Sequence, residues 1–412
     1  MRKKQYLTNP KTAVKNFKVE DFSLITDCFT NVVLSDKVEA TDMTLDSICE
    51  ISETLVKSYY IGNRFFAFMK NDYIYEFYNH RLNPICTNAT LPLMIDVLID
   101  GKKEILIIEK QSASILKKDI TFSFPFGTAI AKYDGRIFVA NGQNIYFSNI
   151  FNFTEYSTNI ENAGFLSVND EDGSVLELIE FGNCLFVICK KAIYKLTISN
   201  QCDFTFSKCE LDYLDILQES VKKVGNSIYF ISQSKLCEFN GSSFKRISGE
   251  FDRHLKTATG SATTTEGLYS IKILIKSTEI FFVYNTFTGK HHYVCEDGGG
   301  SMGENGYVFI REYGMLKKIT SNNILHLFNW ESKEIDFSSP NKKTLLELRI
   351  KTKEELILTI QGDFGKKELH LVEGDNIKKF NLTSKSFKFS ASLEANDFLI
   401  EDMNFKYSIL GE

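Results

Sequence analysis

The chain has 412 residues, of which 43% are hydrophobic and 25% charged, with a formal net charge of −5. This length suits one large domain or two to three ordinary ones. The negative charge excludes a protein coated by nucleic acid, because such surfaces need clustered Lys and Arg. The 35 Phe and 18 Tyr, with only five Pro, favour half-buried β-strands.

The N-terminal region, residues 1–57, is predicted to be an arm followed by a short helical or irregular segment. Its first eighteen residues contain basic side chains and no acid: Arg2, Lys3, Lys4, Lys11, Lys15 and Lys18. A solvated terminal arm is the simpler interpretation. The alternative is an arm that docks on a partner or touches nucleic acid.

The stretch "TLDSICEISETLVKS" is the best helix candidate in this region. Ile48, Ile51 and Leu55 would share one helical face, and Ser47 and Glu50 have the spacing of a capping box. We therefore expect a short helix here.

Targeting signals are not apparent in the sequence. The basic start is followed by "QYLTNPKTAVKNF", which lacks the apolar segment of a signal peptide. No run reaches the roughly 18 apolar residues of a membrane helix. Nine cysteines without such a signal suggest reduced thiols and synthesis in a cytoplasm.

A two-strand pattern recurs along the chain. "YDGRIFVANGQNIYFSN" at 133–149 combines a turn, a short apolar strand, a polar gap and an alternating strand. Similar segments start at Ile61, Asp100, Phe181, Val224, Ser277 and Asn305. The Gly-Asn and Asp-Gly pairs supply the positive-φ residues of a tight hairpin turn. The apolar runs are too short for helices and rich in β-branched and aromatic residues, so they read as buried strands.

The spacing of the repeat favours a β-propeller over residues 58–330. The glycines of the clearest copies are Gly62, Gly135, Gly182 and Gly225, and the last two intervals, 47 and 43 residues, fit a four-stranded blade. The long first interval requires a degenerate copy near Gly101. About six blades are expected, give or take one. A long β-sandwich or a β-solenoid is the structural alternative.

Residues 331–412 lose the repeat but keep strand-like segments. "SFKFSASL" at 386–393 alternates between apolar and polar residues, which gives one buried and one wet face. A small antiparallel β-sandwich is therefore predicted here. The fold class is all-β: a propeller followed by a sandwich-like domain.

Candidate reactive motifs fail on spacing or context. "GGGSMG" at 298–303 precedes a strand rather than the helix of a dinucleotide site, and "NDEDGS" at 169–174 lacks calcium ligands at the required positions. The group Cys184, Cys189, Cys202 and Cys209 lacks zinc-site spacing, and an odd separation places Cys184 and Cys189 on opposite strand faces. The adjacent His291 and His292 likewise face apart.

Carboxylates remain as a weaker possibility. Glu171, Asp172 and Glu180 could form a glycosidase pair, but the sequence does not separate them from a solvated rim. No catalytic, cofactor-binding or metal-ligating residue is therefore predicted, no cofactor is expected, and the protein is not expected to be an enzyme.

Several segments resemble a known family. "AKYDGRIFVANGQNIYFSNIFNFTEYS", "VKKVGNSIYFISQSKLCEFNGSSFKRIS" and "IFFVYNTFTGKHHYV" look like the blades of tail-nozzle and stabilisation proteins of short-tailed bacteriophages and prophages. The segment from "KEIDFSSPNKKTLLELRI" to "IEDMNFKYSIL" is similar to the sandwich that closes many of them. Asn285 stands where an Asp is commoner, and the opening signature of the family is not found near the N-terminus.

The resemblance implies a structural virion protein. It would form a homo-oligomeric ring, with six copies as one expectation, at the neck or tail of a tailed phage. The ring would help retain and conduct DNA. Its partners would be other neck, tail and portal proteins, with at most passing contact with DNA and no membrane, and it would assemble in the bacterial cytoplasm. A glycan- or protein-binding propeller and a propeller hydrolase are the alternatives, because a fold alone does not select a function.

Overall fold

A computed structural model describes residues 13–409 except 20–25, 31, 35–37, 41–42, 52, 87–88, 100, 110–111, 117, 119–120, 157–162, 200–202, 248, 250, 260–261, 266, 276–277, 296–299, 311–313, 322–325 and 396–398. The chain forms two compact units. The propeller unit comprises residues 45–288 and 296–319. The sandwich unit comprises residues 1–44, 289–295 and 320–412.

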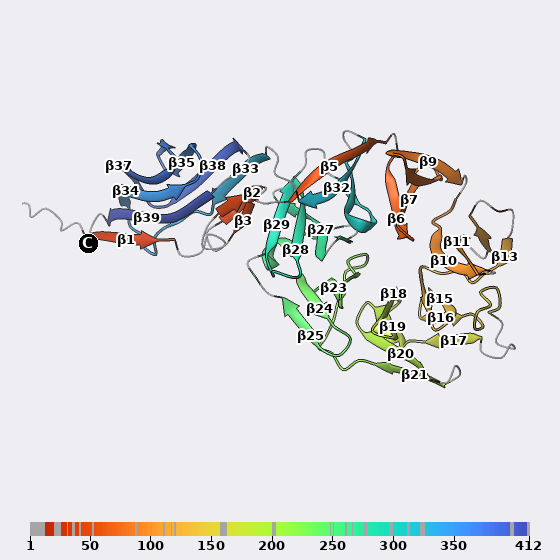
Figure 1. Ribbon diagram of the computed structural model, residues 1–412. Helices are drawn as coiled ribbons and strands as arrows, with labels where there is room; N and C mark the ends of the chain where they lie inside the picture. Colours follow the sequence, from red (N-terminus) through yellow and green to blue (C-terminus); the bar gives the residue numbers. More distant parts are fainter. Residues whose placement is uncertain are drawn as a thin grey trace, which may run out of the picture. The chain divides into compact units, whose positions relative to one another are not determined.

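Seven four-stranded antiparallel sheets are found in the described residues, each a blade (Figure 1). The first blade consists of β6 Leu55–Ile61, β7 Arg64–Met69, β8 Ile74–Tyr78 and β9 Arg81–Cys86. The second consists of β10 Leu93–Ile99, β11 Lys102–Glu109, β12 Ser112–Ile115 and β13 Thr121–Ser123. The third consists of β14 Ala129–Tyr133, β15 Arg136–Asn141, β16 Asn144–Phe147 and β17 Gly164–Ser167. The fourth blade consists of β18 Val175–Phe181, β19 Cys184–Cys189, β20 Ile193–Ser199 and β21 Asp203–Lys208. The fifth consists of β22 Lys222–Val224, β23 Ser227–Ser232, β24 Lys235–Phe239 and β25 Phe244–Ile247. The sixth blade consists of β26 Ala262–Thr265, β27 Leu268–Ile275, β28 Thr278–Asn285 and β29 His291–Cys295. The seventh consists of β30 Gly300–Met302, β31 Tyr307–Ile310, β32 Met315–Ser321 and β5 Met43–Glu50.

The all-β propeller prediction is confirmed, with seven blades against an expected six, give or take one. Short helical segments are η1 Asp170–Asp172, α2 Asp252–Leu255 and η2 Glu304–Gly306. Each first hairpin of a blade turns through a glycine with positive φ, as the repeat predicted. These glycines are Gly62, Gly101, Gly135, Gly182, Gly225, Gly267 and Gly306. In the sixth blade, the predicted repeat that starts at Ser277 covers the third and fourth strands instead of the second and third. The equivalent turn lies at Gly267.

The core of the propeller lies between neighbouring blades. Both faces of each second strand are covered, and Phe138, Val187 and Phe230 have no exposed surface. Cys189 packs in the cluster between blades three and four, whereas Cys184 packs in the cluster between blades four and five. The odd separation of these two cysteines therefore places them on opposite faces, as predicted.

The helix expected around Ser47 is wrong. Residues Met43–Glu50 form β5, which is the outer strand of the seventh blade beside β32, and Leu55 begins β6. The apolar spacing of Ile48, Ile51 and Leu55 was read as helical, but these residues belong to the core shared by the seventh and first blades. Closure of the ring, a non-local contact, outweighs a weak helical period.

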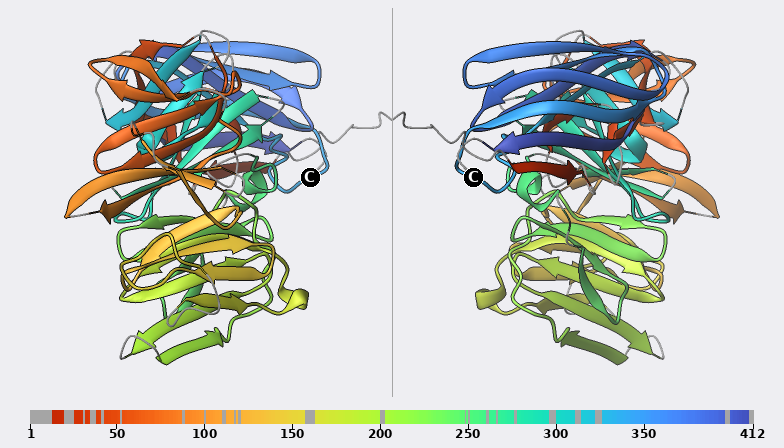
Figure 2. Two further views of the ribbon diagram at one scale, coloured as in Figure 1. Left: turned by 90° about the vertical axis from the view of Figure 1, so that its right-hand side faces the viewer. Right: turned by 90° about the vertical axis from the view of Figure 1, so that its left-hand side faces the viewer.

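The sandwich unit consists of two sheets, and Figure 2 shows its long strands side by side in blue. One sheet contains β3 Val32–Leu34, β4 Val38–Ala40, β39 Leu399–Ile409, β34 Lys343–Thr352 and β37 Gly374–Ser384, with β1 Ala13–Lys18 paired to β39. The other contains β2 Thr26–Thr30, β33 His326–Ser332, β38 Phe387–Ala395, β35 Leu356–Gly362 and β36 Gly365–Leu371. Buried Trp330, Phe389 and Phe405 belong to its core.

Both ends of the chain build this unit. β1 to β4 precede the propeller, and β33 to β39 follow it. Residues 13–18 pair with the C-terminal half of β39, from Ala13 opposite Ile409 to Lys18 opposite Asn404. The propeller is thus an insertion between strands of the sandwich. Residues 1–12 of the predicted arm lie outside the described residues.

Candidate functional site at the propeller axis

Charged side chains from four blades gather where the inner strands meet. Lys57 is in β6, Glu177 in β18 and Lys222 in β22, while Glu304 is in η2 and Glu219 precedes β22. Mutual electrostatic effects link all five. We call these five residues the axial cluster. They come from blades one, four, five and seven, so only closure of the ring assembles them.

An ion pair ties the fifth blade to the seventh. The Lys222 ammonium donates to the Glu304 carboxylate, and the two side chains are 18% and 32% exposed. The backbone around Glu304 is held on both sides: Glu304 N donates to Ser58 Oγ at 2.7 Å, and Gly306 N donates to Thr263 Oγ1 at 2.9 Å. The η2 turn therefore connects the first and sixth blades as well.

Burial disturbs the protonation of the axial cluster. Burial raises the pKa of Glu177, although Lys222 and Lys57 act in the opposite direction. Burial lowers the pKa of Lys57, again partly opposed by Glu177. Burial alone would lower the pKa of Lys222, but the adjoining Glu304 carboxylate outweighs it and holds that pKa above its ordinary value. Burial therefore favours the protonated form of Glu177.

A second ion pair lies between the second and third blades. Asp96 in β10 meets Lys132 in β14 with 2.8 Å between Oδ2 and Nζ. The inner strands therefore present charges of both signs instead of a continuous basic lining. A continuous basic lining is what nucleic acid binding requires.

The axial cluster brings carboxyl and ammonium groups together, and the Ser58 hydroxyl lies beside Glu304. In the part of the chain that the structure describes, no three His, Cys, Asp or Glu side chains gather as a metal site would require. No helix in that part is long and apolar enough to cross a membrane. The arrangement acts most directly on the blades themselves, because the Lys222–Glu304 pair joins two of them.

Sequence reasoning missed the axial cluster. A signal was present: Lys57, Asp96 and Glu177 stand the same number of residues before the turn glycines Gly62, Gly101 and Gly182. Each is a charged residue within an inner strand, where an apolar one is expected. This repeated charged position identifies residues near the axis, but it does not indicate which of them form ion pairs.

The carboxylates that were considered for glycoside hydrolysis do not converge. Glu171 and Glu180 are exposed, whereas Asp172 is buried and accepts hydrogen bonds from Tyr194 Oη at 2.6 Å and Lys208 Nζ at 2.5 Å. Burial acts to raise the pKa of Asp172, but these two donors outweigh it and lower that pKa. Asp172 is therefore an ionised structural group that fixes the turn of η1 to the fourth blade.

The remaining motifs have structural positions. Residues 300–302 of "GGGSMG" form β30, an inner strand, instead of the expected flexible loop; residues 298–299 lie outside the described ones. Cys202 also lies outside the described residues, and Cys209 is half-buried. His292 is buried and His291 only partly so.

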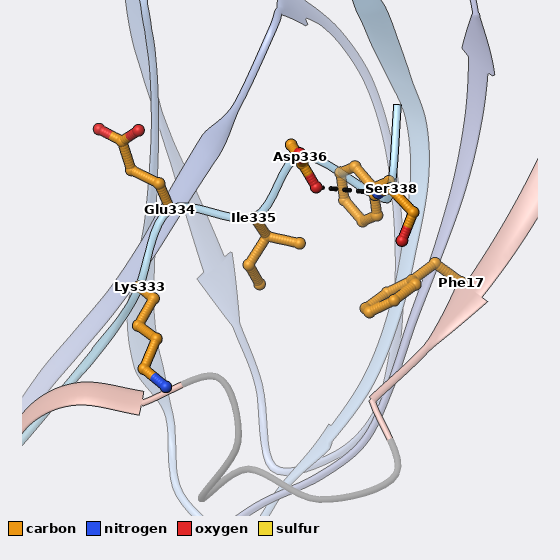
Figure 3. Close-up of a pocket in the computed structure, with 7 residues that line it drawn as sticks. Phe17, Lys333, Glu334, Ile335, Asp336 and Ser338 are labelled. Carbon is orange, nitrogen blue, oxygen red and sulfur yellow. Dashed lines mark hydrogen bonds between the residues drawn. The ribbon is translucent and has the colours of Figure 1, made fainter. Parts of the chain in front are cut away.

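A hollow of about 210 Å³ lies in the sandwich unit, far from the axial cluster in the sequence (Figure 3). Its lining runs from Lys333 to Ser338 with Phe17 opposite, and Ser338 N donates to Asp336 Oδ1 at 2.9 Å. Phe337 and Ser338 both have positive φ, and the Phe337 ring meets Phe17 edge-on at 5.0 Å. The buried Phe337 stabilises this strained turn, so the hollow is a by-product of a packed loop.

Comparisons with known proteins leave the family of this chain open. No family model and no curated protein matches the sequence. Similar solved structures include the extracellular domain of BT4673 from B. thetaiotaomicron, with 10% identity and a TM-score of 0.43 over 83% of this chain and 55% of that chain. BamB from Moraxella catarrhalis has 8% identity and a TM-score of 0.42 over 76% and 99%. The Neurospora crassa Pan2 WD40 domain has 7% identity and a TM-score of 0.45 over 68% and 96%. The chain thus spans only about half of the first of these.

Proposed function

We propose that this protein is a structural component of a tailed-phage virion whose copies form a ring at the neck or tail. The observation that carries the proposal is the interlocked architecture: an N-terminal strand, β5, completes the seventh blade, and β1 pairs with the last six residues of β39 in the sandwich. Both pairings join strands that are distant in the sequence. In each unit, a strand from its start therefore pairs with a strand near its end. Such construction suits a load-bearing subunit.

The blade resemblance supports the same proposal. The segment "YNTFTG" at 284–289 forms the end of β28 and the following turn, where Asn285 Oδ1 accepts hydrogen bonds from Phe287 N and Thr288 N, both at 3.0 Å. Asn285 thus makes the turn-stabilising contacts that an Asp would make at this position. The departure from the family pattern at Asn285 leaves the turn chemistry intact.

The axial charges restrict how such a ring would handle DNA. Because ion pairs such as Lys222–Glu304 join blades near the axis, DNA would pass through a lumen enclosed by several copies instead of through one propeller. The net charge of −5 would limit electrostatic retention of DNA by the bodies that surround that lumen.

A binding propeller is the second candidate, and one observation favours it. Phe151 and Phe287 are 77% and 80% exposed, and each lies over the turn glycine of its own blade, Gly135 and Gly267. Phe151 N donates to Gly135 O at 2.8 Å, and Thr286 N donates to Gly267 O at 2.9 Å. Two aromatic rings are therefore held in the open at the same kind of turn, as at recognition surfaces.

Measuring the mass of the full-length protein separates the two candidates. Light scattering and negative-stain imaging at high and low concentration should show a closed ring, or a monomer that enters a ring when neck or tail proteins are added. A monomer indifferent to those proteins would overturn the structural proposal. A glycan array with wild type and with Phe151→Ala and Phe287→Ala variants would then test the binding propeller.

A further inference from the structure

One end of the sandwich carries an exposed aromatic ring with a lysine ammonium beside it and further lysines in the adjoining segments. Phe364 lies in the turn between β35 and β36 and is 83% exposed. Residues 339–343 and 383–386 join this turn through hydrogen bonds. We call residues 339–343, 362–367 and 383–386 the sandwich tip.

The sandwich tip is rigid rather than loose. Asp363 N donates to Ser384 Oγ at 2.7 Å, and Lys385 N donates to Asp363 Oδ2 at 2.9 Å. The ammonium of the fully buried Lys343 donates to Lys385 O at 2.6 Å and also to Ser339 O. Three segments are therefore fixed to one another below Phe364, and the ring is held outward by an ordered turn.

The charge around Phe364 is mainly positive. Four exposed lysines belong to the sandwich tip: Lys342, Lys366, Lys367 and Lys385. The Lys342 ammonium lies 5.3 Å from the centre of the Phe364 ring. Of the nearby acids, Asp363 accepts a hydrogen bond from Lys385 N at 2.9 Å, and Glu334 accepts one from Ser386 Oγ at 3.2 Å. Glu368 pairs with Lys366 at 2.7 Å.

We propose that the sandwich tip binds an anionic lipid surface, with Phe364 entering the interface and the surrounding lysines meeting lipid phosphates. An exposed apolar side chain with several exposed lysines in the adjoining segments is a combination that interfacial binding uses. The Lys342 ammonium beside the ring would lie at the level of the headgroups. The same ammonium covers one face of Phe364, which opposes the base stacking that single-stranded nucleic acid requires.

This inference goes beyond the proposed virion role and differs from the sequence-based expectation of no membrane partner. The basis for that expectation was the missing apolar span, and peripheral binding needs none. It also explains why a large apolar ring is held rigidly in water, where it contributes little to the fold.

The test is flotation of the full-length protein with vesicles of phosphatidylcholine, with and without phosphatidylglycerol. Wild type should bind only the anionic vesicles, and high salt should release it. Phe364→Ala should weaken the binding about tenfold, since one interfacial Phe is lost. Tyr213→Ala removes another exposed ring from the propeller unit and should leave binding unchanged.

Charge reversal supplies the second arm. The triple variant Lys342→Glu, Lys367→Glu and Lys385→Glu should abolish binding, whereas the same reversal at the exposed Lys102, Lys103 and Lys256 should reduce it little. Circular dichroism verifies that each variant folds. The inference is overturned if wild type ignores anionic vesicles, if Phe364→Ala binds as wild type does, or if a labelled oligonucleotide binds the sandwich tip while vesicles do not.

Discussion

Replacing Lys222 by methionine tests the ion pair that joins the fifth and seventh blades. The change keeps the length and apolar stem of the side chain but leaves the Glu304 carboxylate without its partner, near Glu177. Exposed pairs contribute about 0–1 kcal/mol, and breaking a fully buried pair costs about 3–5 kcal/mol. With side chains 18% and 32% exposed, this pair lies between those limits. We expect a loss of about 1–3 kcal/mol in the free energy of unfolding.

The assay can separate the two units. Trp330 is the only tryptophan, is 1% exposed and lies in the sandwich, so its fluorescence follows that unit. Far-ultraviolet circular dichroism follows both units. In urea, Lys222→Met should lower the midpoint of the dichroism transition assigned to the propeller and leave the fluorescence midpoint in place.

Two variants control this experiment. Lys190→Met breaks an exposed pair with Asp215, where 3.8 Å separates the charged atoms, and should cost almost nothing. Adding Glu304→Gln to Lys222→Met removes the unpaired charge and should restore part of the loss. The reasoning is wrong if Lys222→Met costs no more than Lys190→Met, or if the double variant is no more stable than the single one.

Three further predictions concern protonation, a turn and a thiol. Because burial raises the pKa of Glu177, the folded state holds a proton that the unfolded chain releases. The stability from this proton is therefore lost as pH rises from about 4.5 through the raised pKa, and Glu177→Gln should flatten that decline in urea midpoints; an unchanged slope would contradict it. Gly267→Ala should cost about 1–3 kcal/mol, more than Gly182→Ala, because an added Cβ at Gly267 would meet the Phe287 ring at 2.0 Å whereas Gly182 has open space. Phe287→Ala should remove that difference. Burial raises the pKa of Cys189 to about 12, so mass spectrometry should find it alkylated by iodoacetamide only after unfolding; rapid labelling of the native protein would refute this.

Local features of the sequence were sufficient for the strands and their turns. Positive-φ glycines such as Gly62 and Gly182 favour tight hairpins whatever surrounds them, and alternating apolar residues mark the strands beside them. The same local rule placed Cys184 and Cys189 on opposite faces of β19. These are effects of neighbouring residues, so a single sequence contains them.

Ring closure and the site depended on residues that are distant in the chain. β5 reads as a helix locally, yet it is a strand because its apolar side chains complete the core between the last and first blades. Lys222 and Glu304 are 82 residues apart and become partners only when the ring brings the fifth and seventh blades together. Sequence alone determined what each segment prefers to be. The tertiary structure decided which segments meet, because pairing and burial across the ring outweigh local preferences.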